Sequence, residues 1–145
     1  MKYTILKEYE QNLLRIMDIL GSGTTDNIEL NKLGKYLFVD KFVGVFSSND
    51  MPVLKNNQMC IVNTDPSYRV GTHWISCCKC NGKTYVYDSF DRDVKSLSKY
   101  WKNKHNWINA NKDRDQAYSE NTCGQRSMAW LISFQKYKTK IINVI

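Results

Sequence analysis

Three side chains in this sequence have the chemistry of a nucleophile assisted by a base: Cys123, His73 and Asp88. A thiolate is the nucleophilic form of cysteine, and an imidazole takes and returns a proton near neutral pH. A carboxylate beside the imidazole fixes its tautomer and stabilises its protonated form. The three residues are distant in the sequence, so their chemistry depends on the elements that carry them.

A hairpin brings His73 and Asp88 together. Asn81-Gly82 separates two strand-like runs, residues 73–80 and 83–88, and this dipeptide favours a type I′ turn because both of its residues tolerate positive φ. In that register His73 and Asp88 are diagonal neighbours on one face of the sheet, about 7–8 Å apart at Cα. The sequence therefore predicts an Asp88–His73 contact. A half-exposed ion pair without a catalytic role is the alternative interpretation.

Cys123 begins the last predicted helix, residues 123–137, after the polar residues 119–122. Unpaired N–H groups and the helix dipole stabilise a thiolate at a helix N-terminus, and a protonated histidine lowers the thiol pKa further. The Cys123 N–H can donate to an oxyanion, and Gly124 leaves room for a substrate backbone. A buried core cysteine at the start of a helix is the structural alternative.

The other four cysteines are Cys60, Cys77, Cys78 and Cys80. The odd total and a start without a signal-peptide pattern predict reduced thiols and a protein that is not secreted. Zinc bound by His73 with Cys77, Cys78 and Cys80 is an alternative. However, Cys77 and Cys78 are adjacent on a strand and point to opposite faces. We therefore expect no metal and interpret these four cysteines as packing residues.

The 145 residues are expected to form one domain, 1–145, with its own core and no membrane span. Local patterns predict a helix over 9–20 and a second helix that begins after a Thr24 or Thr25 cap, with Ile28, Leu33 and Leu37 facing inward. The other predicted elements are strands over 42–46 and 59–63, a basic helix over 94–107 and a polar loop over 109–121.

The net charge of +7 is carried mainly by lysine, with abundant asparagine beside it. A basic surface attracts polyanions such as nucleic acids. The same composition also arises in an AT-rich genome without selection for binding, so an ordinary solvated lysine surface is the alternative.

Five motifs occur in a fixed order along the chain: Gly44-Val45-Phe46 with Asp50-Met51-Pro52, Cys60-Ile61-Val62-Asn63-Thr64, Gly71-Thr72-His73-Trp74, Tyr85-Val86-Tyr87-Asp88-Ser89-Phe90, and Gln116 seven positions before Cys123-Gly124. Together they resemble the adenovirus-type cysteine endopeptidases, which have relatives in virophages and polinton-like elements. The resemblance extends over about residues 30–134, and its order of His, acidic residue, Gln and Cys also matches the ubiquitin-like protein proteases.

The resemblance implies an α+β fold, with a mixed central sheet surrounded by helices, and it implies a role for each matching residue. Cys123 attacks the scissile carbonyl, His73 acts as base and then acid, and Asp88 orients His73. Gln116 donates a side-chain N–H to the oxyanion hole, beside the Cys123 N–H. Trp74 forms a wall of the substrate channel.

The implied activity is cleavage of viral capsid or precursor polypeptides at glycine-containing sites during virion maturation. Such an enzyme works inside the infected cell and in the virion, and we expect a monomer that does not bind membranes. Two alternatives stay open. One is a deubiquitinase-like or deSUMOylase-like protease acting on Gly-Gly tails, and the other is a catalytically silent basic module that binds nucleic acid.

The sequence also differs at several positions from the family that it resembles. The acidic position is Asp88, where the adenovirus enzymes carry Glu. No cysteine lies between Asp88 and Cys123, where His105 stands near the place of the cofactor-binding cysteine. A disulfide-linked peptide cofactor is therefore not expected. DNA stimulation, another property of that family, stays open through a basic face formed by Lys95, Lys99, Lys102 and Lys104.

Overall fold

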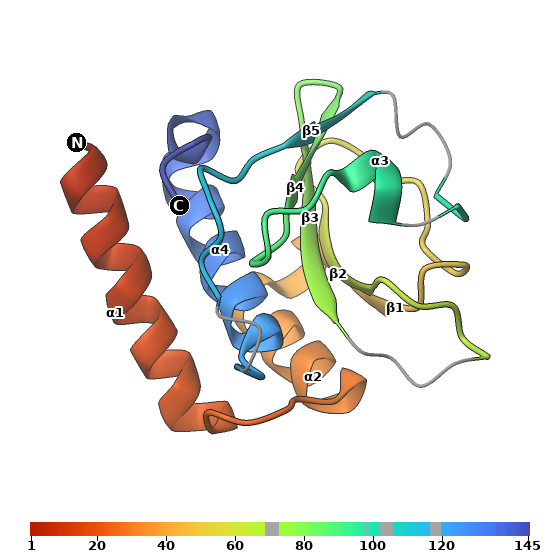
Figure 1. Cartoon of the computed structure of the whole chain (residues 1–145), viewed down its shortest axis with the longest axis horizontal. Helices are drawn as coiled ribbons and strands as arrows, with labels where there is room; N and C mark the ends of the chain where they lie inside the picture. The colour runs from red at the N-terminus through yellow and green to blue at the C-terminus, as the bar shows by residue number, and fades with distance from the viewer. Residues whose placement is uncertain (69–72, 98, 102–105, 117–119) are drawn as a thin grey trace.

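The computed structural model describes residues 1–68, 73–97, 99–101, 106–116 and 120–145. It has the α+β organisation expected from the sequence (Figure 1). No helix in these ranges is long and apolar enough to cross a membrane. The elements are α1 (Lys2–Leu20), α2 (Asn27–Phe38), the 3-10 turn η1 (Val39–Lys41), β1 (Phe42–Phe46), β2 (Met59–Asn63), β3 (Trp74–Cys80), β4 (Lys83–Tyr87), α3 (Val94–Leu97), β5 (Trp107–Asn109), α4 (Cys123–Tyr137) and the 3-10 turn η3 (Lys138–Ile141).

The five strands form one mixed sheet in the order β1-β2-β3-β4-β5. The two central pairings, β2 with β3 and β3 with β4, are antiparallel. The outer strands β1 and β5 pair in parallel with β2 and β4. Strands β1 and β2 lie at the positions predicted from the sequence.

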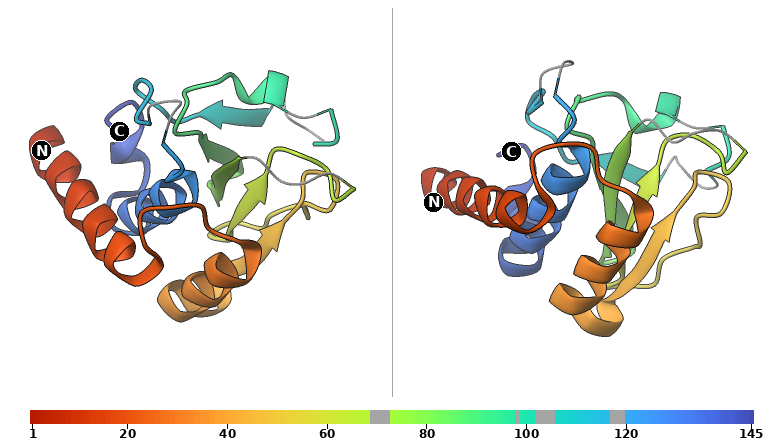
Figure 2. Two further views of the ribbon diagram at one scale, coloured as in Figure 1. Left: turned by 60° about the horizontal axis from the view of Figure 1, so that its bottom comes forward. Right: turned by 90° about the horizontal axis from the view of Figure 1, so that it is seen from below.

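Helix α4 covers one face of the sheet, and α1 packs on the side of α4 away from the strands (Figures 1 and 2). The core between these layers is aromatic: Tyr87 of β4 stacks on Trp130 of α4, and Trp130 packs against Phe134. A second hydrophobic cluster covers the opposite face of the sheet, where Val62 and Ile75 are buried with Trp101. Because both faces of β2 are covered, all five of its residues are buried.

The β3–β4 hairpin has the predicted register. Asn81 and Gly82 occupy the turn with φ of 52° and 80°, as a type I′ turn requires. Cys80 pairs with Lys83 at the turn, and Ser76 pairs with Tyr87 at the far end. The paired strands end one residue short of the predicted limits on each side. His73 therefore immediately precedes β3 and Asp88 immediately follows β4.

The first two helices differ from the prediction at their ends. Helix α1 starts at Lys2, because Ile5 and Tyr9 extend the face that it buries against α4. Helix α2 is capped by Asp26, not by Thr24 or Thr25. The Asp26 side chain accepts from the Glu29 N–H, and the Glu29 side chain accepts from the Asp26 N–H, which is a capping box.

The inward face of α2 also differs from the prediction. Leu33 is buried as expected and Leu37 is half-buried, but Ile28 is 71% exposed. The face that α2 buries consists of Leu30, Leu33, Gly34 and Phe38. The shift follows from the capping box, because a helix that starts at Asn27 places Leu30 in its first turn toward the core.

The predicted helix over 94–107 is wrong. Helix α3 ends at Leu97, and Trp107 begins β5, whose residues pair with Thr84–Val86 of β4. Sheet pairing therefore overrides the local helical spacing of Leu97, Trp101 and Trp107. Asn109 likewise belongs to β5, and the rest of the predicted polar loop has no helix or strand in the ranges described.

Candidate active site

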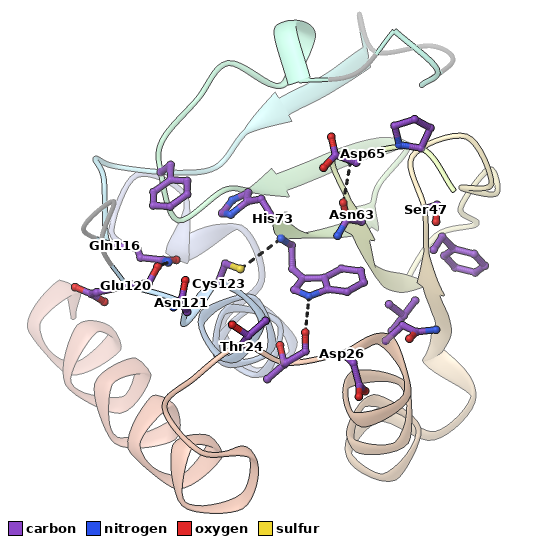
Figure 3. Close-up of a pocket in the computed structure, with 17 residues that line it drawn as sticks. Thr24, Asp26, Ser47, Asn63, Asp65, His73, Gln116, Glu120, Asn121 and Cys123 are labelled. Atoms are coloured by element: carbon purple, nitrogen blue, oxygen red, sulfur yellow. Dashed lines mark hydrogen bonds between the residues drawn. The ribbon is translucent and has the colours of Figure 1, made fainter. Parts of the chain in front are cut away.

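A cavity of about 570 Å³ opens where β3 begins, β4 ends and α4 begins. His73, Gln116 and Cys123 point into it from three separate segments (Figure 3). Trp74 also lines it, as predicted for a wall of a substrate channel. Asp88 lies behind His73 and is 1% exposed. The structure thus gathers the catalytic residues proposed from the sequence around one cavity.

Cys123 is the first residue of α4, at the helix N-terminus that the sequence predicted. Its Sγ accepts a hydrogen bond from the backbone N–H of Trp74, at 3.5 Å. Burial raises the pKa of the Cys123 thiol, but His73 and the N–H groups of Trp74 and Gly124 offset it. The net pKa lies below the ordinary value of a thiol, which favours the nucleophilic thiolate.

His73 is held between a carboxylate and an aromatic ring. Its Nε2 lies 2.6 Å from Asp88 Oδ1, and its ring stacks on Phe90 with centroids 4.5 Å apart. Burial lowers the pKa of His73, but the hydrogen bond with Asp88 and the nearby charges of Asp88 and the Cys123 sulfur more than compensate, so the pKa is raised. The other ring nitrogen, Nδ1, is buried without a hydrogen-bond partner among the described residues. Nδ1 is therefore the ring nitrogen that Asp88 does not engage.

Asp88 is braced on both of its carboxylate oxygens. Oδ1 accepts from the Phe90 N–H at 2.9 Å, and Oδ2 accepts from Arg92 Nε at 2.9 Å. Asn111 holds the backbone, since its side chain bonds both the N–H and the carbonyl of Asp88. Burial raises the pKa of Asp88, but the bonds from His73, the Phe90 N–H and Arg92 outweigh it. The net pKa lies below its ordinary value, so Asp88 is ionised beside His73.

Arg92 and Asn111 were not predicted from the sequence. Arg92 lies four positions after Asp88, and it also lies over the Phe90 ring, 5.5 Å from the centroid. That spacing is a weak signal outside a helix. Asn111 offered no signal of its own, because its contact depends on the course of the chain after β5.

Gln116 has a defined amide orientation. Its Nε2 lies 2.6 Å from the Glu120 carbonyl oxygen, which only accepts hydrogen bonds, so the nitrogen must be on that side. The Ser89 hydroxyl donates to Oε1 at 2.6 Å, and the Gln116 N–H donates to the Ser89 carbonyl at 3.0 Å. An amide nitrogen carries two protons, so one remains for a ligand in the cavity. Ser89 was missed as a positioning residue, although it directly follows Asp88.

Gly124 does not have the role predicted for it. It is buried and lies outside the lining of the cavity. A Cβ at this position would clash with Thr25 Oγ1 and lie 3.2 Å from Leu30 Cδ2. The glycine is needed for close packing of α4 against the segment before α2.

The segment that leads into α2 forms a further wall, with Thr24, Thr25 and Asp26 on the cavity. The Trp74 indole N–H donates to the Thr25 carbonyl at 3.1 Å. Gln125 Nε2 donates to the carbonyls of Gly21 and Gly23, both at 2.8 Å. Trp74, next to His73, and Gln125, two positions after Cys123, therefore connect this wall to the segments that carry the proposed catalytic residues. Thr24 and Thr25 were predicted only as helix caps, not as part of the cavity wall.

The other cysteines occupy separate places. Cys77 is buried with Cys60 in the second cluster, whereas Cys78 belongs to the core under α4. Their opposite orientation confirms the expected alternation along β3. Among the residues that the structure describes, no group of three histidine, cysteine or acidic side chains is arranged to hold a metal ion.

The basic face predicted for DNA lies only partly within the described residues. Lys95 lies in the short helix α3, and Lys99 lies beyond its end with its Nζ over the Tyr100 ring. Lys102, Lys104 and His105 lie outside the described residues, as do Gly71 and Thr72 of the histidine motif. Helix α3 therefore carries Lys95 but not Lys99, and DNA binding stays a prediction.

No protein-family model matches the chain, and no curated protein sequence matches it significantly. The function of the chain is therefore inferred from the geometry and the chemistry of the cavity.

Proposed function

We propose that this chain is a cysteine endopeptidase in which Cys123 is the nucleophile, His73 the general base and acid, and Asp88 the residue that orients His73. The observation that carries the proposal is the order of contacts at the cavity. Asp88 bonds Nε2 of His73, which leaves the buried Nδ1 for Cys123, and a backbone N–H supports the sulfur. A core cysteine or a surface ion pair does not require this arrangement.

Proton transfer from the thiol to His73 Nδ1 gives the attacking thiolate, and Nε2–H keeps its bond to Asp88. The sulfur adds to the scissile carbonyl carbon, and the carbonyl electron pair moves onto its oxygen. In the proposed mechanism, the second N–H of Gln116 Nε2 and the backbone N–H of Cys123 donate to that oxyanion. These donors act only as negative charge develops, which is the condition for lowering a barrier.

Protonation of the departing amine by His73 Nδ1 accompanies cleavage of the C–N bond, which leaves a thioester on Cys123. Water then gives a proton to Nδ1 and adds to the thioester carbonyl. Cleavage of the C–S bond releases the carboxylic acid product, and the thiolate–imidazolium pair is restored.

The substrate class is proposed from the resemblance to adenovirus-type endopeptidases: viral capsid or precursor polypeptides with glycine near the cleaved bond. The cavity is consistent with a narrow channel, because Trp74 lies directly beside Cys123 and is held by its bond to Thr25. A large side chain next to the scissile bond would meet this ring. Action on Gly-Gly tails of ubiquitin-like proteins is the competing substrate class.

Internally quenched peptides that carry glycine at the centre of a varied sequence test the proposal. We expect cleavage by the wild type and by Cys80→Ala, which removes a half-buried thiol away from the cavity, and none by Cys123→Ala. Release of aminomethylcoumarin from a ubiquitin C-terminal conjugate, without peptide cleavage, would assign the Gly-Gly class. Cleavage that persists in Cys123→Ala would refute the proposed nucleophile.

A further inference from the structure

A partly buried polar cluster outside the catalytic residues is centred on one carboxylate oxygen. Asp115 Oδ2 accepts hydrogen bonds from the hydroxyls of Tyr9 in α1 and Tyr87 in β4, and from Arg126 in α4 at 2.9 Å. Both tyrosines are buried. Burial is the main cause, and the charge of a neighbouring group the second cause, that raises the pKa of each hydroxyl well above its usual value. The two hydroxyls therefore stay protonated and act as donors. Three elements thus converge on the residue that precedes Gln116.

Arg126 uses every nitrogen of its guanidinium in this region. Nη1 binds Asp115, Nη2 binds Glu120 Oε2 at 3.0 Å, and Nε donates to Thr122 Oγ1 at 3.0 Å. Asp115 directly precedes Gln116, and Glu120 follows it by four positions. Thr122 is the N-cap of α4, the helix that starts with Cys123. One side chain of α4 therefore joins both sides of Gln116 to the start of the nucleophile helix.

The bonds of the Gln116 amide pass through these same residues. Its Nε2 donates a hydrogen bond to the carbonyl oxygen of Glu120. The side chain of Glu120 is held in turn by an ion pair with Arg126. Its Oε1 accepts a hydrogen bond from the Ser89 hydroxyl. The Ser89 carbonyl accepts hydrogen bonds from the backbone N–H groups of both Asp115 and Gln116. Movement of Asp115 or Glu120 would therefore shift the amide relative to Cys123. Arg126 contacts neither His73 nor Cys123 in any hydrogen bond or ion pair recorded for the described residues.

We propose that Arg126 is a positioning residue, which aligns the Gln116 amide with Cys123 as an oxyanion donor by joining Asp115, Glu120 and Thr122. This inference rests on the proposed function, because it concerns the donor that acts during acyl transfer. It separates two properties of the site: His73 and Asp88 control the thiolate, and the Arg126 cluster controls the oxyanion donor.

Two reactions of Cys123 separate these properties. Alkylation by iodoacetamide displaces iodide and forms no oxyanion, so its rate reports the thiolate. Acylation by p-nitrophenyl acetate passes through an oxyanion, since the thiolate adds to the ester carbonyl and expels p-nitrophenolate, which leaves an acetyl thioester. The ratio of the two rates measures the oxyanion donor without knowledge of the natural substrate.

We expect Arg126→Met and the milder Glu120→Gln to lower the acylation rate about tenfold or more, with alkylation changed less than about twofold. Gln116→Ala should lower the same ratio, and adding Arg126→Met to it should cause no further loss, because the donor is already absent. Lys136→Met removes an α4 cation that pairs with Glu8 and should leave the ratio unchanged. Thermal unfolding of each variant confirms that it is folded.

The results distinguish the inference from the proposed function. If Gln116→Ala lowers the ratio but folded Arg126→Met and Glu120→Gln do not, the positioning role is wrong and the enzyme proposal stands. Additive losses in the double variant, or equal falls in both reactions, would also overturn the positioning role. If the wild type shows no Cys123-dependent acylation at all, both proposals fail together.

Discussion

His73 Nε2 lies 2.6 Å from Asp88 Oδ1, although fifteen positions separate the two residues in the chain. The contact exists because each residue stands just beyond the paired part of a two-stranded hairpin. Trp74 begins β3 and Tyr87 ends β4, so His73 and Asp88 meet at this end of the hairpin, with His73 on the cavity and Asp88 behind it. Because Nε2 is bonded to Asp88, the proposed mechanism assigns Nδ1 of His73 to the sulfur of Cys123.

Replacing Asp88 with asparagine should make stability depend less on pH. Because the pKa of Asp88 is lowered from 3.8, its contribution is present above that value and lost as pH falls through the folded pKa. Because the pKa of His73 is raised from 6.5, its contribution is present below that value and lost as pH rises through the folded pKa. The wild type should exceed Asp88→Asn in stability most between about pH 4 and pH 6.5. Urea unfolding across this range measures the difference, and a constant difference at every pH would contradict the pairing.

Arg92 shares the charge of Asp88 with His73, so Arg92→Gln should raise the pKa of His73 further. The loss of a cation beside Oδ2 leaves the negative charge of Asp88 less compensated. The chain has two histidines, so the titration of His73 can be followed by NMR and assigned with His73→Ala. Lys95→Gln is the matched control, since it removes the same charge without a recorded bond to Asp88. A pKa of His73 that falls in Arg92→Gln would show that Arg92 mainly orients the carboxylate.

Gly124→Ala should destabilise the fold by about 1–3 kcal/mol, because the added methyl overpacks the contact with Thr25 and Leu30. Thr25→Ala in the same chain should recover part of the loss, since it removes the atom that clashes. Gly23→Ala is the control, because no atom lies within 4 Å of its added Cβ. A Gly124→Ala variant that keeps wild-type stability but binds substrate poorly would instead restore the role predicted from the sequence.

Trp74→Phe keeps an aromatic wall but removes the N–H that binds the Thr25 carbonyl at 3.1 Å. Loss of this hydrogen bond should cost about 0.5–1.5 kcal/mol in the free energy of unfolding. The backbone N–H of Trp74 still reaches Cys123 Sγ, so the alkylation rate of Cys123 should be retained. A large fall in that rate would show that the indole also fixes the backbone donor.

The hairpin explains why much of the site could be predicted from the sequence. Asn81-Gly82 sets a register with little freedom, and this register alone brings His73 and Asp88 into reach. The position of Cys123 followed from a polar segment that ends at a helical run. The start of a helix depends on local residues, and the register of a hairpin depends on its turn and on the regular pairing of its strands. Both can therefore be predicted without knowledge of the tertiary structure.

The remaining parts depend on long-range packing. Arg92, Asn111 and Ser89 act through segments without helical or strand periodicity, so spacing carried no information about them. Strand β5 was missed because Trp107 also fits a helical pattern, and only pairing with β4 decides between the two. The role of Gly124 was misassigned because the sequence does not show that Thr25 packs against it.

The rate of iodoacetamide alkylation of each cysteine against pH, read by mass spectrometry, tests the central claim most directly. If a thiolate–imidazolium pair is present, Cys123 should be alkylated rapidly at pH values well below the ordinary thiol pKa of about 8.5. It also predicts that His73→Ala abolishes this advantage, while half-buried Cys80 reacts alike in both proteins. A Cys123 that titrates like an ordinary thiol in the wild type, or that keeps its low-pH reactivity without His73, would contradict the account.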